Sequence, residues 1–510
     1  MYGFSALHTR LSDPVALVIL LYFLRLVKSI AKRVVSGYNI TIETIVGRKQ
    51  TVGNPLVDSY FHSLKGKRVV VVGIGVSNRP LIRMLLSYGI DVCACDRTER
   101  EALEPEVLEL EQMGARLFVG EGYLDHVSAD VVFRTPGLHP NHPALCRMRD
   151  EGAVITSEME AFFAVCPCKI IGVTGSDGKT TTTTLIAEML KHAGKTVWLG
   201  GNIGQPLLPM ASGMKEEDVA VVELSSFQLM GMTQSPHIAV ITNLAPNHLD
   251  VHASMEEYVQ AKENLYLYQG AQGRLVLNLD NEITASFAEK HRGETLLFSR
   301  NSSPEHGVWL KDGVIYSDGK ALLKQSGILL PGLHNVENYM AAIGAVRGLV
   351  SEEDICAVAE QFGGVEHRIE LVRELDGVRY YNDSIASSPS RTIAGLHAFD
   401  QKVILIAGGY DKQIPFDGLG PEIVTHVKRL ILCGATADKI RASVEEAADF
   451  CPGKPEIQVV NTLEEAVWDA RNNSVPGDVV TLSPACAAFD QFKNFMVRGK
   501  TFKEFVRKLT

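Results

Sequence analysis

One short stretch, residues 172–185, reads GVTGSDGKTTTTTL and constrains the fold more than any other part of the chain. It follows an apolar run led by Lys169 and opens onto a helical pattern, so it predicts a strand, a glycine-rich loop and a helix. Backbone N–H groups at a helix N-terminus attract phosphate, Lys179 adds a positive charge, and the Thr180 hydroxyl can ligate Mg²⁺. Val173 stands where the strict P-loop pattern has glycine, so the loop is shortened. A purely structural glycine turn is the weaker interpretation, because a run of threonines forms helix poorly.

Length, charge and cysteine content exclude some classes of protein. The 510 residues suffice for about three domains. The net charge of −10 argues against a nucleic-acid partner, which normally needs a basic surface. Nine cysteines over this length are too sparse for a disulfide scaffold, so we expect a reducing, cytoplasmic location. Cys166 and Cys168 form a close pair, but metal sites usually need two such pairs, and we expect ordinary thiols.

The first 65 residues form an N-terminal extension with its own pattern. Asp13 and Pro14 suit a helix start, and an apolar run follows over residues 15–24. This run is too short to span a bilayer, which takes about 20 residues. Basic residues follow the run instead of preceding it, which disfavours a signal peptide. Two interpretations stay open: a basic helix over residues 13–35 that contacts a membrane surface, and a non-native extension from a misassigned start codon.

Strands alternate with helices over the rest of the chain, which predicts an α/β protein with three domains on mainly parallel sheets. We assign residues 66–158 to a Rossmann-like N-terminal domain, 159–364 to a P-loop ATPase-like central domain and 365–510 to a Rossmann-like C-terminal domain. The strands that define them cover residues 68–73, 219–224, 238–243, 403–409, 430–434 and 479–485.

The first domain begins with a partial dinucleotide fingerprint. Gly73 and Gly75 follow the first strand, and Asp96 ends the second, where a ribose-binding acid often lies. Asn78 replaces the third glycine. The pattern alone is weak, because a tight strand-to-helix turn needs glycine anyway.

Polar residues at strand ends of the central domain indicate a metal site. Glu223 ends a β-branched strand in the same sheet as the phosphate loop, where it can serve as a second magnesium ligand. His248 and Asp250 follow another strand, and the Ser254–Glu257 spacing predicts a capping box that starts a helix. Lys262 lies within the apolar stripe of that helix, between aromatic residues. Most such lysines only extend to solvent, but this one suggests a lowered pKa or a chemical modification.

Nine segments resemble the Mur ligases in order and spacing, from about residue 66 to the C-terminus. They are TGSDGKTTTT, GGNIG, ELSSFQL, NHLDVH, AKENL, PGLHNVEN, EHRIE, YNDS and SPACAAFDQFKNF. The ELSSFQL and SPACA-x-x-DQFKNF segments resemble the D-glutamate-adding branch. The resemblance implies a monomeric, ATP- and Mg²⁺-dependent ligase that joins D-glutamate to UDP-N-acetylmuramoyl-L-alanine through an acyl phosphate, in peptidoglycan precursor synthesis.

The same resemblance implies roles for individual residues around the nucleotide. Lys179, His248 and Lys262 would be catalytic, and Lys262 matches the family's carbamylated lysine. Magnesium would be held by Thr180, Glu223, His248 and Lys262. ATP would contact Gly175, Ser176, Asp177, Gly178, Lys179, Thr180, Thr181, Asn335, Asn338, Arg368 and Asp383.

Two further sets of residues would bind the other substrates. The UDP-sugar substrate would contact Gly75, Val76, Ser77, Asp96, Arg97, Thr98, Asn202 and Ser225. The amino acid would contact Ser387, Arg391, Lys412, Phe489 and Phe495.

The amino-acid pocket departs from the family pattern. Ile385 and Ser387 stand where many D-glutamate-adding members have lysine and threonine, and Ala488 stands where serine is common. We expect Arg391 to replace the missing charge. The alternatives are a ligase of the same fold with another acceptor or amino acid, such as L-glutamate or a folylpolyglutamate-type substrate, and a catalytically silent ATP-binding scaffold.

Overall fold

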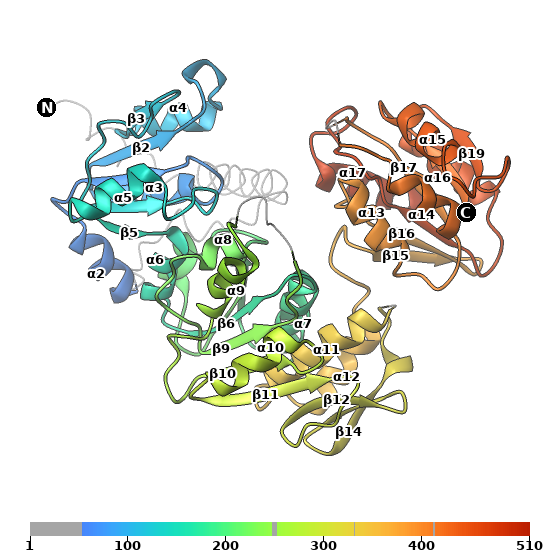
Figure 1. Ribbon diagram of the computed structural model, residues 1–510, viewed down its shortest axis with the longest axis horizontal. Helices are drawn as coiled ribbons and strands as arrows, with labels where there is room; N and C mark the ends of the chain where they lie inside the picture. The colour runs from blue at the N-terminus through green and yellow to red at the C-terminus, as the bar shows by residue number, and fades with distance from the viewer. Residues whose placement is uncertain (1–53, 247–251, 331, 412–413) are drawn as a thin grey trace, which may run out of the picture. The chain divides into compact units, whose positions relative to one another are not determined.

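The computed structural model describes residues 54–246, 252–330, 332–411 and 414–510 and contains three β-sheets in this part of the chain (Figure 1). The predicted helix over residues 13–35 lies outside the described residues. All three sheets are mainly parallel, which confirms the predicted α/β class. The inner strands of each sheet are short runs of mainly β-branched and aliphatic residues whose side chains are buried on both faces, as parallel strands covered by helices require.

The first sheet is parallel throughout, in the order β3-β2-β1-β4-β5 (Figure 1, blue to cyan). The helix α2 falls within the predicted N-terminal extension, yet its Phe61 ring stacks on Tyr88 with centroids 4.9 Å apart, so this domain begins at about residue 55. The elements are α2 (Pro55–Ser63), β1 (Val69–Val72), α3 (Asn78–Ser87), β2 (Val92–Asp96), α4 (Pro105–Gln112), β3 (Arg116–Val119), β4 (Val131–Arg134), α5 (Pro143–Asp150), β5 (Val154–Thr156) and α6 (Glu158–Val165).

The central sheet has nine strands in the order β14-β13-β12-β11-β10-β9-β6-β8-β7. Its helices α7 and α11 pack on one another and share a buried apolar cluster with the strands beneath them. The elements are β6 (Lys169–Thr174), α7 (Lys179–His192), β7 (Val197–Gly201), β8 (Val219–Glu223), α8 (Ser226–Leu229), β9 (Ile238–Ile241), α9 (Met255–Glu263), β10 (Arg274–Asn278), α10 (Glu282–Ser286), β11 (Glu294–Ser299), β12 (Gly307–Lys311), β13 (Val314–Ser317), β14 (Lys320–Lys324), α11 (Leu333–Val346) and α12 (Glu352–Gln361).

The strands β12, β13 and β14 form an antiparallel meander that the alternating α/β pattern does not predict. Each of its two turns is an Asp-Gly pair in which both residues have positive φ, at Asp312-Gly313 and Asp318-Gly319. This is the conformation of the two-residue hairpin turn, whose twist matches that of the flanking strands. The Asp-Gly pairs are therefore the sequence signal for the meander.

The third sheet has the order β15-β16-β20-β17-β18-β19, with only the β15–β16 pair antiparallel (Figure 1, orange to red). Loops that follow β16, β17 and β20 emerge at the carboxyl edge of the sheet, where ligands bind in open α/β folds. The elements are β15 (Glu370–Leu375), β16 (Val378–Asn382), α13 (Pro389–Leu396), β17 (Val403–Ala407), α14 (Leu419–His426), β18 (Val427–Leu432), α15 (Ala437–Glu445), β19 (Glu456–Val459), α16 (Leu463–Asn472), β20 (Val479–Leu482) and α17 (Phe495–Lys508).

Among the helices in the described ranges, none combines the length and apolar character needed to cross a bilayer.

Glu158, the first residue of α6, is a buried carboxyl group whose main partner is the backbone N–H of Leu208 at 3.2 Å. Burial raises the pKa of Glu158 to about 7. The folded state therefore keeps this proton up to a higher pH than the unfolded chain, and stability falls as the pH rises from about 4.5 to about 7.

We predict that Glu158→Gln stabilises the protein at pH 8, because glutamine keeps the oxygen that accepts from Leu208 and carries no charge. The free energy of unfolding in urea should rise by about 1–3 kcal/mol at pH 8 and should change little near pH 4.5. The exposed Glu216→Gln is the control. A loss of stability at pH 8 in the Glu158 variant would contradict the prediction.

Candidate active site

The phosphate loop, residues 175–178, connects β6 to α7 and is held by the end of the neighbouring strand β9. The Ser176 and Asp177 backbone N–H groups donate to the Asn243 carbonyl and side-chain oxygen, at 2.8 and 2.9 Å. The Thr242 hydroxyl donates to the Asp177 carbonyl at 2.5 Å. Sequence reasoning missed Thr242 and Asn243, although their position just after a buried strand beside β6 was an available signal. These contacts fix the loop so that α7 begins at Lys179 with its N–H groups at the carboxyl edge of the sheet.

Lys179 bends back over the loop, and its Nζ donates to the carbonyls of Gly175 and Ser176 at 3.0 and 2.8 Å. Burial lowers the pKa of Lys179, although the nearby Glu223 and Asp177 carboxylates partly offset this effect. The ammonium group therefore lies where a bound phosphate would compete for it with two neutral carbonyls. A charged phosphate oxygen is the stronger acceptor.

The five threonines divide into two groups. Thr183 and Thr184 donate to the carbonyls one turn back, at 2.7 and 2.8 Å, and Thr182 donates to the Asn338 side chain at 3.2 Å. Asn338 in turn donates to Asn335, both on α11. The last three threonines thus stabilise the helix and its contact with α11, while Thr180 and Thr181 lie in its first turn beside the loop.

Glu223, at the end of β8, has one satisfied and one unsatisfied carboxylate oxygen. Its Oε1 accepts from the Asn202 amide at 2.8 Å, and Asn202 also donates its backbone N–H to the Glu223 carbonyl. Its Oε2 is buried and has no hydrogen-bond partner among the described residues. A buried, unpaired carboxylate oxygen is costly unless a ligand satisfies it, and oxygen donors are what Mg²⁺ prefers. Glu223 is therefore suited to hold this ion, whereas the Thr180 ligand stays a prediction.

Lys262 is almost completely buried, with a relative exposure of 1%. Its Nζ donates to the Thr174 hydroxyl at 3.1 Å and to the Gly175 carbonyl at 3.0 Å, and it lies 4.8 Å from the centre of the Tyr258 ring. Burial, reinforced by the charge of Lys179, lowers its pKa well below the ordinary lysine value. The side chain therefore lies beneath the phosphate loop as a group with a strong tendency to lose its charge.

The helix that carries Lys262 begins as predicted, with one difference. The Ser254 hydroxyl accepts from the Glu257 N–H, so Ser254 is the N-cap. The Glu257 side chain, however, accepts from the N–H of Ala253 and not from that of Ser254. The predicted capping box is therefore wrong for the second of its two hydrogen bonds, the one from the N-cap N–H to the glutamate side chain. His248 and Asp250 lie outside the described residues.

Ser225 forms a capping box at the start of α8. Its hydroxyl accepts from the Gln228 N–H, and the Gln228 side chain accepts from the Ser225 N–H. The next residue, Ser226, contacts His252 Nε2 at 2.9 Å. The ELSSFQL segment is thus explained locally by a short helix that begins just after Glu223.

In the first domain, Asp96 supports the glycine turn that follows β1. Its two oxygens accept from the N–H groups of Ile74 and Thr98, at 2.7 and 3.0 Å. Burial alone would raise the pKa of Asp96, but these hydrogen bonds outweigh it and the pKa is lowered. Asn78, which replaces the third glycine, donates to the Gly73 carbonyl at 2.8 Å. The turn therefore leaves Val76 exposed at its tip and the Ser77 and Arg97 side chains beside it.

At the carboxyl edge of the third sheet, a buried arginine that sequence reasoning missed joins two loops. Arg498 on α17 donates to the carbonyls of Ser384, Cys486 and Ala487 at 3.0, 3.0 and 3.1 Å, and to the Ser384 hydroxyl at 3.1 Å. The Tyr410 N–H also donates to the Ala487 carbonyl, which adds the loop after β17. The three loops that contain the predicted amino-acid site are thus held in one arrangement.

The predicted residues on these loops differ in exposure. Ser387 is half-buried, Phe489 is exposed and packs edge-on against Tyr410, and Phe495 starts α17 and packs against His367. Arg391 donates to the carbonyl of Ile385 at 3.3 Å, so it reaches the residue that replaces the family's lysine. Lys412 lies outside the described residues.

Asp383, at the end of β16, is buried and accepts from the Ser483 hydroxyl at 2.7 Å and from the Ile369 N–H at 3.3 Å. Burial raises its pKa to about 7. Arg368 precedes it in the same domain, with its Nε unpaired among the described residues. Arg368 therefore retains an unpaired donor that a ligand can use.

The phosphate loop, with Lys179, Lys262 and Glu223 around it, is typical of an enzyme that uses a nucleotide, and comparison with known proteins shows that its class is the ligases. The Mur ligase middle domain matches residues 173–346, and the domain described as Mur ligase, glutamate ligase domain matches residues 367–486. The chain belongs to the Mur ligase family.

The similar full-length proteins indicate the reaction more specifically than the domain matches do. The chain is 50% identical over 463 residues to the UDP-N-acetylmuramoylalanine--D-glutamate ligase of Acetivibrio thermocellus, covering 89% of this chain and 99% of the relative. It is 51% identical over 444 residues to the ligase of the same name from Clostridium botulinum, covering 87% and 97%. The fold is similar to the crystal structure of UDP-N-acetylmuramate-alanine ligase from Thermotoga maritima, with a TM-score of 0.52 at 20% identity over 86% of this chain and 99% of that one.

Two glycines at opposite ends of α7 allow a controlled test of the phosphate loop. Gly178 and Gly194 have nearly the same backbone conformation, with φ of 76° and 75°. A Cβ on Gly178 would lie 2.2 Å from Oδ1 of the buried Asn338, whereas a Cβ on Gly194 would have no neighbour within 4 Å.

We predict that Gly178→Ala weakens ATP binding by about tenfold or more and that Gly194→Ala does not. Both substitutions force a residue with a Cβ into a left-handed conformation, at a cost of about 1–2 kcal/mol. Only Gly178→Ala also displaces Asn338. Calorimetric titration with a non-hydrolysable ATP analogue measures the difference. Equal affinities in the two variants would show that the contact with Asn338 does not shape the loop.

Proposed function

We propose that this chain is an ATP-dependent ligase that joins D-glutamate to UDP-N-acetylmuramoyl-L-alanine, releasing ADP and phosphate, in the synthesis of peptidoglycan precursors. The observation that carries the proposal is the cluster formed by Lys179, Lys262 and the unpaired oxygen of Glu223 around one phosphate loop. The relatives that bear this activity in their names are about half identical over nearly their whole length.

The chemistry explains why these groups are needed together. A carboxylate is a poor acyl donor until one of its oxygens is phosphorylated. The substrate carboxylate attacks the γ-phosphorus of ATP and ADP leaves; the amine of the amino acid then attacks the acyl carbon, phosphate leaves, and the amine loses a proton. Charge on the transferred phosphoryl group must be stabilised, and Lys179 and the α7 N-terminus supply that stabilisation.

Glu223 and Thr180 would hold Mg²⁺, which supplies positive charge to the phosphate oxygens. Asn202 positions Glu223 by donating to Oε1, which leaves Oε2 available to hold the ion. His248 is a further proposed ligand. In the third domain, Arg368 and Asp383 are proposed to contact the γ-phosphate and the ribose.

The proposal is tested by phosphate release from the purified chain with ATP, Mg²⁺ and UDP-N-acetylmuramoyl-L-alanine against a panel of D- and L-amino acids. We expect release only with D-glutamate, together with a product whose mass equals the sum of both substrates less one water. Release that does not depend on the amino acid would overturn the ligase assignment. A preference for L-glutamate would leave the assignment to the ligases unchanged but would replace D-glutamate as the proposed substrate.

Lys262 is proposed to be carbamylated in the active enzyme. Its low pKa favours the neutral amine, whose nitrogen lone pair forms a bond to the carbon of CO₂ as the nitrogen releases a proton to solvent. The product is an anion that can support a metal ion, which accounts for a lysine in the interior. The positive charge of the neighbouring Lys179 would favour the new anion.

We predict that Lys262→Ala lowers kcat by at least about a hundredfold with little change in the affinity for ATP, because the lost group acts on the transition state. A short-chain carboxylic acid should restore part of the activity. Carbon-13 NMR with labelled bicarbonate should show a carbamate signal in the native chain that the variant lacks. The exposed Lys191→Ala is the control, and undiminished activity of the Lys262 variant would remove the carbamate from the mechanism.

Arg391 is proposed to bind a carboxylate of the incoming D-glutamate in place of the family's lysine. Its hydrogen bond to the Ile385 carbonyl supports this, because it directs the guanidinium to the position that lost the cation. Ser387, Phe489 and Phe495 would form the rest of the pocket with Lys412. Ala488 is buried, so the hydroxyl that other members have at this position is not replaced locally.

We predict that Arg391→Ala raises KM for D-glutamate by about 10–100-fold, because a charge-assisted hydrogen bond contributes about 1.5–3 kcal/mol. KM for ATP and for the UDP substrate should not change, and Arg391→Lys should recover part of the loss. Arg441→Ala, on another helix of the same domain, is the control. An unchanged KM for D-glutamate in Arg391→Ala would exclude this role.

The UDP-substrate contacts are proposed to come from the turn at Gly75, Val76 and Ser77, from the segment 96–98, and from Asn202 and Ser225. A monomeric state and a membrane-surface contact through residues 13–35 remain predictions.

A further inference from the structure

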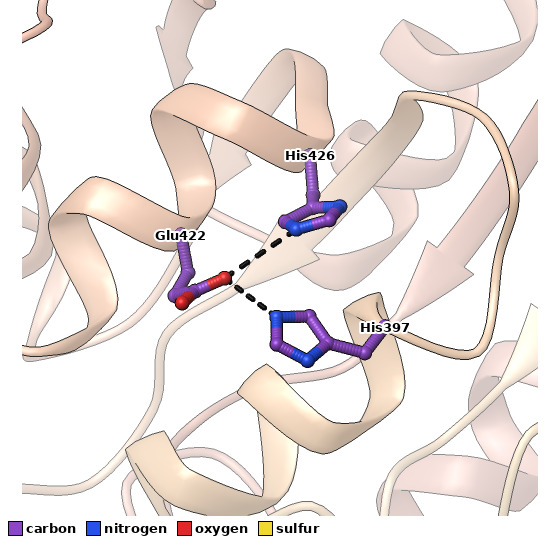
Figure 2. Close-up of side chains that lie close together, drawn as sticks. All are labelled: His397, Glu422 and His426. Carbon is purple, nitrogen blue, oxygen red and sulfur yellow. Dashed lines mark hydrogen bonds and ion pairs between the residues drawn. The ribbon is translucent and has the colours of Figure 1, made fainter.

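Two histidines and a glutamate lie together on the third domain, outside the site described above (Figure 2). His397 follows the last residue of α13, while Glu422 and His426 lie one turn apart on α14. One oxygen, Glu422 Oε2, lies 2.6 Å from His397 Nε2 and 3.4 Å from His426 Nε2. Figure 2 shows both imidazole rings directed at this oxygen from two helices.

The geometry is close to that of a metal site. One potential donor atom from each residue lies within 4.8 Å of the other two, and no other three such residues in the described ranges meet this condition. Tetrahedral zinc places its ligand atoms about 3.3 Å apart. His397 and Glu422 would have to separate by less than an ångström, and the side chains are 29–52% exposed, so they have room to rotate.

The donor types determine which metal suits the site. Two imidazoles with one carboxylate are typical ligands for zinc and its neighbours in the transition series, whereas Mg²⁺ prefers oxygen donors alone. The spacing of Glu422 and His426, four residues apart on one helix, puts their side chains on the same face. His397 is the one ligand that does not belong to α14, and it lies beside the other two because α13 packs on α14.

We propose that His397, Glu422 and His426 bind one Zn²⁺ ion, with water completing its coordination. The ion links the C-terminal end of α13 to α14. The first turn of α13 is held to the loop after β20, because the Thr392 hydroxyl oxygen accepts from the Ala485 N–H at 2.9 Å. With zinc bound at its C-terminal end, the helix whose first turn carries Arg391 would be restrained at both ends. Metal binding itself does not depend on the proposed catalytic function.

The test uses the untagged full chain in excess Mg²⁺ and without ATP, titrated with Zn²⁺ by calorimetry and with Co²⁺ by visible absorption. We expect one ion per chain, and a cobalt spectrum of nitrogen and oxygen coordination without thiolate charge-transfer bands. The double variant His397→Gln/His426→Gln should weaken binding by at least about a hundredfold and Glu422→Gln by at least about tenfold.

Zinc should raise the melting temperature of the native chain on the order of 5 °C at a hundredfold excess over Kd, and not that of the double variant.

The matched control is His192→Gln, because His192 forms an exposed pair with Asp354 at 2.7 Å without a second histidine. It should bind zinc as the native chain does. Cys166→Ser/Cys168→Ser controls for the thiol pair, whose sulfur atoms are 3.5 Å apart. Circular dichroism and ATP affinity verify that each variant folds. Zinc binding that survives in the double histidine variant, or that is lost in the cysteine variant, would overturn the proposal, as would the absence of binding to the native chain.

Discussion

The burial of the Lys262 amine beneath the phosphate loop is the constraint on which the rest of the central domain depends. An ammonium group in the interior is costly unless it is paired, and among the described residues its acceptors are two neutral oxygens, from Thr174 and Gly175. Both acceptors belong to the junction of β6 and the loop. The same contacts that satisfy Lys262 therefore fix the loop from below, while Thr242 and Asn243 fix it from the side. A group that is unstable as a cation in this position is well suited to chemical modification.

The central strand–loop–helix unit could be predicted from sequence because every local signal agrees: the β-branched strand, the glycines and the polar first turn of the helix. Lys262 could be identified because a lysine in an apolar stripe conflicts with its surroundings. The antiparallel meander of β12–β14 was not predicted, although Asp-Gly turns specify it, because the alternating pattern of the flanking regions favoured parallel strands. The contribution of Arg498 could not be predicted, because its main acceptors are backbone carbonyls. Every residue has a backbone carbonyl, so the sequence does not show which of them an arginine will contact.

Arg498 also holds two of the loops that carry the proposed amino-acid pocket. The loops at Ser384 and at Cys486–Ala487 are held by backbone contacts to a buried guanidinium, so their course does not depend on which side chains they display. The replacement of a lysine at Ile385 and of a serine at Ala488 changes the chemistry of the pocket without removing its support. In the proposed pocket, the Arg391 guanidinium would supply charge from α13, and the position of α13 would then contribute to the specificity for the amino acid.

The two metal sites argued for this chain differ in donor type, and that difference keeps them independent. Glu223 and Thr180 offer oxygen, which suits Mg²⁺ and the phosphates that accompany it. His397, Glu422 and His426 offer two nitrogen donors and one oxygen donor. This donor set binds zinc more strongly than magnesium, so the selectivity does not depend on the concentrations of the two ions. Both sites can therefore be filled at once in a mixture of the two ions. The proposed zinc ligand His397 directly follows the helix that carries Arg391, whereas the proposed magnesium ligand Glu223 lies in the central domain with the phosphate loop. Loss of zinc should therefore change KM for the amino acid before it changes KM for ATP.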